Sequence, residues 1–509
     1  MGKSAISRRR FLQLMGLSAA SGALAACAGA TPAQAPAATS APAATPNIAA
    51  TEAVLAAQAT EAAIAMQARA EEEIFKMTAE QYAAMVEQNV AKALQEGKTV
   101  IEMLSAYGTI IEDKTQPHFW ILRNFMQKHP EIYVRYSPSS AYTGAFNEVI
   151  MMRIASGDPP DCILHYSAPI AYAARGTCRP LDDLMDVHPV GNKDAWEKSA
   201  LAQLQWNGKT WGVPLNGSQN AMFYNVEVLE ARGISTKRED LPKTLDELLE
   251  LSQALTEWDG DTLKVAGYTP FEGNWSWPGK MVANGGIIWD GEKYTINHEK
   301  NVELVEYWIS WIDKLYKGDI DLLRAQGTMN NTYPEGAFGL GIQVVCDDGL
   351  WSLTHVPPER KYEVSVMPTG PSGTRHATSN WPNMMFIPTG AKHVKEAFEL
   401  CVYYGTEGQI EWWHRWSDVP YWKDFPADVA PQDLIARVGE AKALELTRFA
   451  REYASEIVVQ WNSPVEDFAT DEIYRAVDSA LHKQQSAKAA LDAAQEIVSA
   501  KLQEVITGA

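Results

Sequence analysis

The sequence has few cysteines and few basic residues, and both shortages limit what the protein can be. Its 509 residues include five cysteines. Cys162, Cys178, Cys346 and Cys401 form no C-x-x-C pair, so we expect free, buried thiols and no zinc site. Lysine and arginine number 44 against 64 acidic residues, which gives a net charge of −20. This charge argues against a nucleic acid partner, because phosphate contacts need a basic surface.

Motifs of several enzyme classes are also missing. The sequence has no H-E-x-x-H pair and no G-x-S-x-G turn. Gly208-Lys209-Thr210 lacks the upstream glycine of a phosphate-binding loop. We therefore expect no metal, no cofactor and no catalysis. Acid pairs such as Asp347-Asp348 leave one alternative open, a surface hydrolase that uses two carboxylates on a carbohydrate.

A long apolar run is missing everywhere except near the N-terminus, where its context indicates export. Arg8, Arg9 and Arg10 precede an apolar, small-residue stretch that ends in Leu24-Ala25-Ala26-Cys27. A basic start, a short apolar stretch and a small-residue cleavage site are typical of a signal peptide. The paired arginines indicate the twin-arginine route. We expect residues 1–26 to be a twin-arginine lipoprotein signal and Cys27 to carry lipid. The protein would then work outside the cytoplasm, in contact with the cell membrane through the lipid on Cys27.

The rest of the chain changes composition in three steps. Residues 27–50 are nearly all Ala, Pro and Thr, a composition that cannot fold and that predicts a tether. Residues 51–97 are rich in Ala, Glu and Gln, which predicts a helical stalk with a thin apolar face. From residue 98 onward, apolar runs alternate with helical patterns. This alternation predicts parallel β-α-β units and an α/β fold.

Several segments, taken in order, resemble the family 1 extracellular solute-binding proteins of ABC transporters, which include the maltose- and oligosaccharide-binding proteins. No single segment is specific for this family, but the order of the segments over roughly residues 98–505 is specific for it. The matching segments are Ile154–Asp161, Gly176–Leu184, Trp206–Pro214, Phe223–Gly233 and, less well, Pro334–Leu340.

This resemblance implies two α/β lobes joined by crossing hinge strands, with the residue 51–97 stalk as a helical N-terminal extension. The first lobe would take residues 98–212 and 349–405, and the second 213–348 and 406–509. The chain would cross near Val213, return near Asp347–Gly349 and cross again between Phe386 and Trp412. The ligand would be a carbohydrate, the partners the membrane permease subunits of an ABC importer, and the protein a monomer. A non-sugar solute on the same fold is a further alternative.

Candidate binding residues follow from the chemistry of a sugar, which offers apolar ring faces and a rim of hydroxyl groups. Flat aromatic side chains beside amides or carboxylates suit such a ligand. Among the 17 tryptophans, several lie in loop-like segments beside polar residues. Two roles are equally favoured for Trp412, Trp413 and Trp416: packing in the core and contact with the ligand. The candidate ligand-binding residues are Tyr107, Tyr142, His165, Asn216, Trp275, Trp277, Asp348, Trp351, Asn380 and Trp381.

Overall fold

The computed structural model describes residues 76–507, except 109–111, 140–143, 271–272, 325–331, 358, 427–428 and 458–461. The expected signal, the tether, Cys27, the first part of the stalk and Tyr142 lie outside the described residues. Within the described residues, no helix combines the length and the apolar character needed to cross a membrane. The four cysteines there are free and buried, as expected.

The alternation predicted from residue 98 is confirmed. Strands β1 (Thr99–Ser105), β2 (Ile132–Pro138) and β3 (Cys162–His165) are parallel neighbours. They are joined through helices α4 (Pro117–Lys128) and α5 (Gly144–Ala155). Pro117 begins α4 at a position where a missing N–H costs nothing. Pro159 and Pro160 follow α5 and prevent its continuation. Helix α3 (Ala79–Gln95), the described part of the stalk, contacts β1 and β2.

Helices cover both faces of this sheet and form the first core. On one face, Cys162 and Leu164 pack against α4, α15 (Val394–Gly405) and α16 (Gln409–Arg415). On the other face, Ile163 packs with residues of α5 and α6 (Ile170–Ala174). The alternation of neighbouring residues between faces is the two-residue period of a strand. The smaller elements that follow are α7 (Asp182–Met185), α8 (Lys198–Ala202), β4 (Gln205–Trp206) and β5 (Lys209–Thr210).

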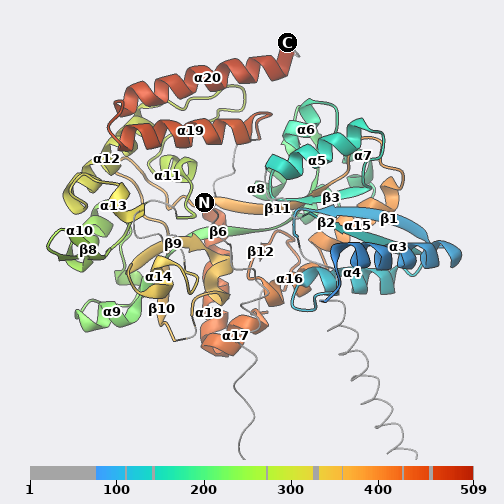
Figure 1. The fold of residues 1–509 in the computed structure, drawn as a ribbon, viewed down its shortest axis with the longest axis horizontal. Coiled ribbons are helices and arrows are strands. Elements are labelled where there is room, and N and C mark those ends of the chain that lie inside the picture. Colours follow the sequence, from blue (N-terminus) through green and yellow to red (C-terminus); the bar gives the residue numbers. More distant parts are fainter. Residues whose placement is uncertain are drawn as a thin grey trace, which may run out of the picture. The chain divides into compact units, whose positions relative to one another are not determined.

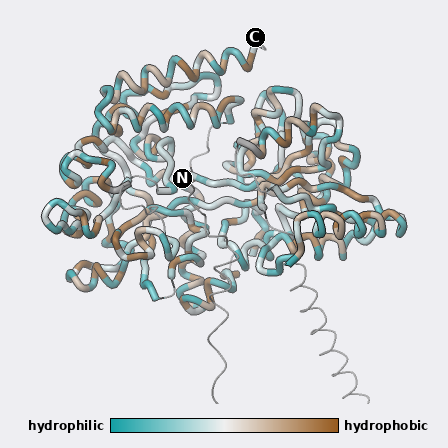
Figure 2. The backbone as a smooth tube through the Cα atoms, in the orientation of Figure 1, coloured by the Kyte–Doolittle hydropathy of each residue, from teal (hydrophilic) through white to brown (hydrophobic). Residues whose placement is uncertain are grey.

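One long strand joins the first core to a second one. Strand β6 (Val213–Asn225) is buried along all 13 residues. Its first half pairs with β11 (Asn380–Phe386), which in turn pairs with β3. Its second half pairs with β9 (Val345–Gly349) and β10 (Tyr362–Ser365). Figure 1 shows β6 and β11 running between the two groups of helices, and Figure 2 shows hydrophilic residues along these crossing strands.

The second core is surrounded mainly by helices. It contains Trp308 and Trp311 of α12 and residues of the C-terminal pair α19 and α20. Its elements are α9 (Val226–Ala231), α10 (Leu245–Leu255), β7 (Glu257–Asp259), β8 (Thr262–Val265), α11 (Trp277–Ala283), α12 (Glu299–Leu315), α13 (Asp321–Arg324), α14 (Ala337–Leu340), α17 (Gln432–Val438), α18 (Glu440–Tyr453), α19 (Glu466–Leu481) and α20 (Ala487–Thr507).

The chain returns to the first core later than the expected position at Asp347–Gly349. Leu350, Val364 and Ala377 are all buried in the second core. The reason is that β10 pairs with the second half of β6, which holds this stretch in place until β11 crosses. Residues 406–415 also differ from the expected assignment, because α16 packs on α4. The next crossing is β12 (Val419–Pro420), which pairs with β6.

Candidate ligand-binding cleft

Trp381 is the most accessible aromatic residue on the crossing strands. Its side chain is 41% exposed, whereas the other residues of β11 are buried. Its indole Nε1 donates a hydrogen bond to the carbonyl oxygen of Asn274, a residue of the second lobe, at 3.2 Å. The edge of the ring is thus fixed while part of its surface remains accessible. A fixed, accessible indole is suited to stacking on an apolar ligand face.

A chain of side-chain hydrogen bonds runs across the crossing strands beside Trp381. The Tyr107 hydroxyl donates to Asn383 Oδ1 (2.7 Å), and Asn383 Nδ2 donates to Asn216 Oδ1 (2.7 Å). Asn216 Nδ2 then donates to Gln409 Oε1 (2.9 Å). Asn383, Asn216 and Gln409 are buried. We call these four residues the amide relay; it ties the loop after β1 to both β6 and β11.

Aromatic rings surround Tyr107 at the end of the relay. The ring centroids of Tyr166 and Trp416 lie 4.9 and 5.0 Å from that of Tyr107. All three residues are half-buried. The His118 ring, 4.9 Å away, is fully enclosed, and burial lowers its pKa to about 3. At neutral pH this wall of the first lobe therefore carries no charge at His118.

The acidic residues of β9 are occupied by donors from the surrounding loops. Asp348 is buried and accepts hydrogen bonds from Asn274 Nδ2 (2.6 Å) and from the backbone N–H and hydroxyl of Thr332 (3.0 and 2.8 Å). Burial raises its pKa. Asp348 thus holds the Asn274 loop, which in turn fixes Trp381. Trp351, half-buried, is placed by a hydrogen bond from its backbone N–H to Ser218 Oγ of β6 (2.9 Å).

Trp275 and Trp277 lie in the second core, with 1% and 7% of their surfaces exposed. Lys280 Nζ lies 5.1 Å from the centroid of each ring. Burial lowers the pKa of Lys280 to about 8, and burial raises the pKa of nearby Asp347 to about 6. These two tryptophans therefore pack around a buried cation, whereas the exposed ring belongs to Trp381.

The remaining candidates are dispersed. His165 is buried and contacts Asn147 of α5. Asn380 is buried and donates to the Tyr421 hydroxyl. Trp412 and Trp413 are buried in the first and second cores. Sequence reasoning missed Tyr166, although its position directly after His165 at a strand end was a usable signal.

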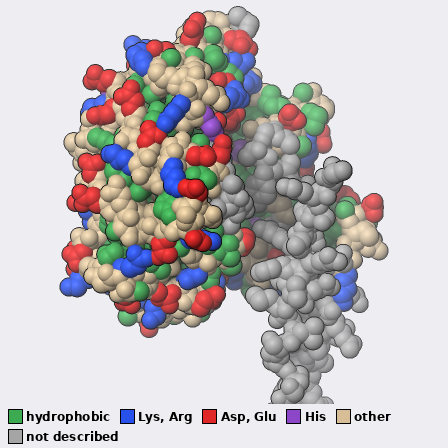
Figure 3. Space-filling view, turned by 60° about the vertical axis from the view of Figure 1, so that its left-hand side comes forward, with side chains coloured by type: hydrophobic (Ala, Val, Ile, Leu, Met, Phe, Trp, Pro, Cys, Tyr) green, Lys and Arg blue, Asp and Glu red, His purple; other side chains and the backbone are tan. Residues whose placement is uncertain are grey.

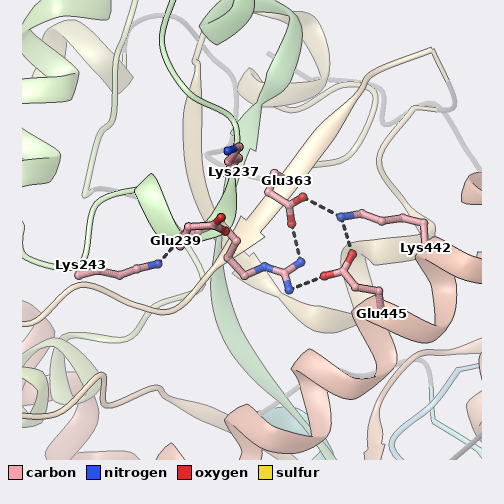
Figure 4. A pocket seen from close by; sticks show the side chains of 7 residues that line it. Lys237, Glu239, Lys243, Glu363, Lys442 and Glu445 are labelled. Atoms are coloured by element: carbon pink, nitrogen blue, oxygen red, sulfur yellow. Dashed lines mark hydrogen bonds and ion pairs between the residues drawn. The ribbon is translucent and has the colours of Figure 1, made fainter.

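A surface hollow of about 530 Å³ lies on the second lobe, but its charges satisfy one another (Figure 4). Glu363 forms ion pairs with Arg238 (2.5 Å) and Lys442 (2.7 Å), and Glu445 pairs with the same two cations. Such a ring stabilises the junction of β10 and α18. Figure 3 shows acidic and basic side chains interspersed over the face drawn there. No group of His, Cys, Asp or Glu among residues 76–507, as far as these are described, could hold a metal.

Comparisons with known proteins agree with this architecture. A binding protein of Brucella abortus (strain 2308) is 24% identical over 243 residues, 45% of this chain and 54% of the relative. The chain thus spans about half the length of the curated relatives it matches.

Two solved structures share the two-lobed fold. An ABC substrate-binding protein from Listeria monocytogenes in complex with cycloalternan has a TM-score of 0.65 at 16% identity, covering 81% of this chain and 99% of that one. CpMnBP1 with mannotriose bound has a TM-score of 0.64 at 19% identity, covering 78% and 99%. A family model described as bacterial extracellular solute-binding protein matches residues 91–411, more than half of the chain. The protein therefore belongs to the bacterial extracellular solute-binding proteins, a family of binding proteins that work outside the cytoplasm.

Proposed function

We propose that the protein binds an oligosaccharide beside Trp381 on its crossing strands and delivers it to an ABC importer. The observation that carries this proposal is the accessible indole of Trp381, fixed at its edge by Asn274. The half-buried rings of Tyr107 and Trp416 contact each other, and the Tyr107 hydroxyl donates to Asn383, two residues after Trp381 on β11. Similar structures contain cycloalternan, mannotriose or maltose. Aromatic plates beside amides match the two surfaces of a sugar.

The remaining parts of the proposal concern how the protein is held and what it delivers to. The signal at residues 1–26 would direct twin-arginine export, lipid on Cys27 would anchor the chain, and residues 27–50 would act as a tether. The lobes would close over the ligand and present it, as a monomer, to the permease subunits. Motion of this kind is absorbed at a few hinge residues.

Binding without catalysis is part of the same proposal. A two-carboxylate hydrolase needs one acid free to protonate the leaving group and one free to act as base or nucleophile. Asp348 is already occupied by three donors, and Asp347 accepts from the Tyr268 hydroxyl (2.9 Å) and the Trp275 N–H (2.6 Å). This disfavours the hydrolase alternative for the acid pair in β9.

Calorimetric titration of the purified protein with mannobiose, mannotriose, maltose and maltotriose tests the proposal. A disaccharide has ~23 heavy atoms, and at roughly 0.3 kcal/mol per atom it would bind with a micromolar dissociation constant. Trp381→Ala should weaken binding at least tenfold. Trp258→Ala, on the β7–β8 hairpin, is the matched control and should bind like the unaltered protein. Equal affinity in the Trp381 variant would remove this residue from the site, and release of reducing ends from the sugars would favour the hydrolase.

A further inference from the structure

The segment Gly273–Ser276 precedes helix α11 and holds Trp381 through its backbone. The Asn274 carbonyl oxygen accepts the hydrogen bond from Trp381 Nε1 (3.2 Å). The segment rests directly on β9, since a Cβ on Gly273 would lie 2.3 Å from Asp347 Oδ2. Only glycine allows the backbone to approach the carboxylate this closely. The contact with Asp347 therefore determines where the edge of the Trp381 indole is held.

One peptide group connects Trp381 to Asp347. Its carbonyl, from Asn274, accepts from the Trp381 indole. Its N–H, from Trp275, donates to Asp347 Oδ2 (2.6 Å). Because a peptide group is planar, the direction of the N–H also sets the direction of the carbonyl. The Tyr268 hydroxyl donates to Asp347 Oδ1 (2.9 Å) and so holds the carboxylate in place.

Lys280 of α11 holds the carbonyl group on the other side of Trp275. Its Nζ donates to the Trp275 carbonyl oxygen and lies 5.1 Å from the centroids of the Trp275 and Trp277 rings. Helix α11 packs against α12 and α19 (Figure 1), and Lys280 is only 2% exposed. The backbone of Trp275 is thus held by a buried carboxylate on one side and by a buried ammonium group on the other.

Both of these groups are charged at neutral pH. Burial lowers the pKa of Lys280 to about 8, and the charge of Asp347 opposes this effect. Burial raises the pKa of Asp347 to about 6, and the charge of Lys280 opposes that effect. Charges are costly to remove from water, and well-packed apolar residues in place of a buried pair are often as stable or more stable. The pair therefore needs an explanation other than the stability of the core.

Lys280 is the cation among the titratable groups that surround Asp347. The others are Asp348, Cys346, Tyr268 and Tyr474. Burial raises the pKa of each of them, so the thiol and the two phenols stay neutral up to pH 9. The positive charge lost from this cluster between pH 7 and 9 is therefore that of Lys280.

We propose that Lys280 and Asp347 are positioning residues for sugar binding, which grip the backbone of Trp275 from both sides and thereby orient Trp381 for the ligand. Both side chains are buried, so they act through the backbone and not by touching the sugar. A charged partner strengthens a hydrogen bond, which makes this grip firmer than one between neutral groups. This inference rests on the proposed function and adds two residues that set the affinity at its site.

The substitution Lys280→Met tests the inference with little change of shape. Methionine fits between the two indole rings, but it has no charge and cannot donate to the Trp275 carbonyl. We expect the affinity for mannotriose or maltotriose to fall at least fivefold in a calorimetric titration. Lys300→Met is the matched control. Lys300 is a half-buried lysine of α12 that also donates to a backbone carbonyl, that of Ser372 (3.4 Å), and its loss should leave affinity unchanged.

A double-mutant cycle with Trp381→Ala distinguishes positioning from a general loosening of the fold. If Lys280 acts through Trp381, Lys280→Met should change the affinity by less than twofold once the indole is absent. A general loosening would instead lower the affinity by the same factor in both backgrounds.

The outcomes separate the two proposals. Wild-type protein that binds none of the sugars overturns the proposed function and this inference with it. If sugar binds, three results overturn the positioning role alone: unchanged affinity in Lys280→Met, an equal loss in both backgrounds, or unchanged affinity in Trp381→Ala. If Lys280→Met does not fold, titrations of the wild type at pH 7 and pH 9 decide. A fall in affinity of at least threefold at pH 9 supports the inference, and constant affinity overturns it.

Discussion

Replacing Asn383 by leucine should destabilise the protein through the amide relay. Asn383 is 4% exposed and connects Tyr107 to Asn216, which is fully buried. Leucine has nearly the same shape but can neither donate nor accept. The change removes two hydrogen bonds and leaves Asn216 Oδ1 without a donor. An orphaned buried polar group costs about 1–3 kcal/mol, so we expect a loss of about 2–3 kcal/mol in the free energy of unfolding.

A double-mutant cycle makes this prediction specific. Asn216→Leu alone should cost a similar amount, because it leaves Asn383 Nδ2 without its acceptor and Gln409 Oε1 without its donor. In the double variant the orphaned groups of the Asn216–Asn383 pair are both gone. The combined loss should therefore be smaller than the sum of the single losses by about 1–2 kcal/mol.

Urea unfolding followed by tryptophan fluorescence measures all four proteins of the cycle. Asn89→Leu, on the exposed face of α3, is a control for added apolar surface and should change stability by about 0.5 kcal/mol or less. A loss below about 0.5 kcal/mol for Asn383→Leu, or losses that simply add, would refute the reasoning. Such a result would mean that Asn216 and Asn383 do not stabilise the protein through their hydrogen bond.

Three further predictions use separate features. Burial raises the pKa of Asp418 to about 7, against 3.8 ordinarily, so the native state holds a proton that the unfolded chain releases. Stability should therefore fall as pH rises from about 4 to about 7; melting curves at pH 5 and 8 should show a smaller fall for Asp418→Asn. Gly349→Ala would place a Cβ 2.2 Å from the Trp351 ring. This variant should lose about 1–3 kcal/mol in the free energy of unfolding, measured by thermal unfolding. An unchanged melting temperature would contradict this. Glu363→Gln removes the ion pairs of Glu363 with Arg238 and Lys442 (Figure 4). It should lower the free energy of unfolding by about 1–2 kcal/mol at low salt and by less in 1 M NaCl. A loss that does not depend on salt would exclude an electrostatic cause.

The fold was predictable from the sequence because its signals are local. Apolar runs alternate with helical patterns from residue 98 onward, and strands such as β1 and β3 form in those runs. Proline after α5 marks a boundary whatever surrounds it. The later return to the first core was not predictable, because the pairing of β10 with β6 joins segments more than a hundred residues apart.

The site was predictable only in part. Trp275 and Trp381 look alike in the sequence, since both follow asparagine and precede a small or rigid residue. Tertiary packing alone separates them: one indole is enclosed by the second core and the other faces outward from a strand. Tyr107 and Asn383, which share a hydrogen bond in the amide relay, are 276 residues apart in the chain. No periodicity or motif relates residues so far apart.

The crossing strands also determine how this chain can be divided. Trp412 completes a core whose first strand begins at Thr99, while Val364 and Leu446, on either side of Trp412 in the chain, belong to the other core. No single cut therefore yields a fragment with one finished lobe. A nascent chain must be synthesised as far as Trp412 before the first core is complete, and into α20 before the second is. An experiment that isolates or exchanges one lobe would therefore have to include several separate segments of the chain, and a simple truncation would leave both cores incomplete.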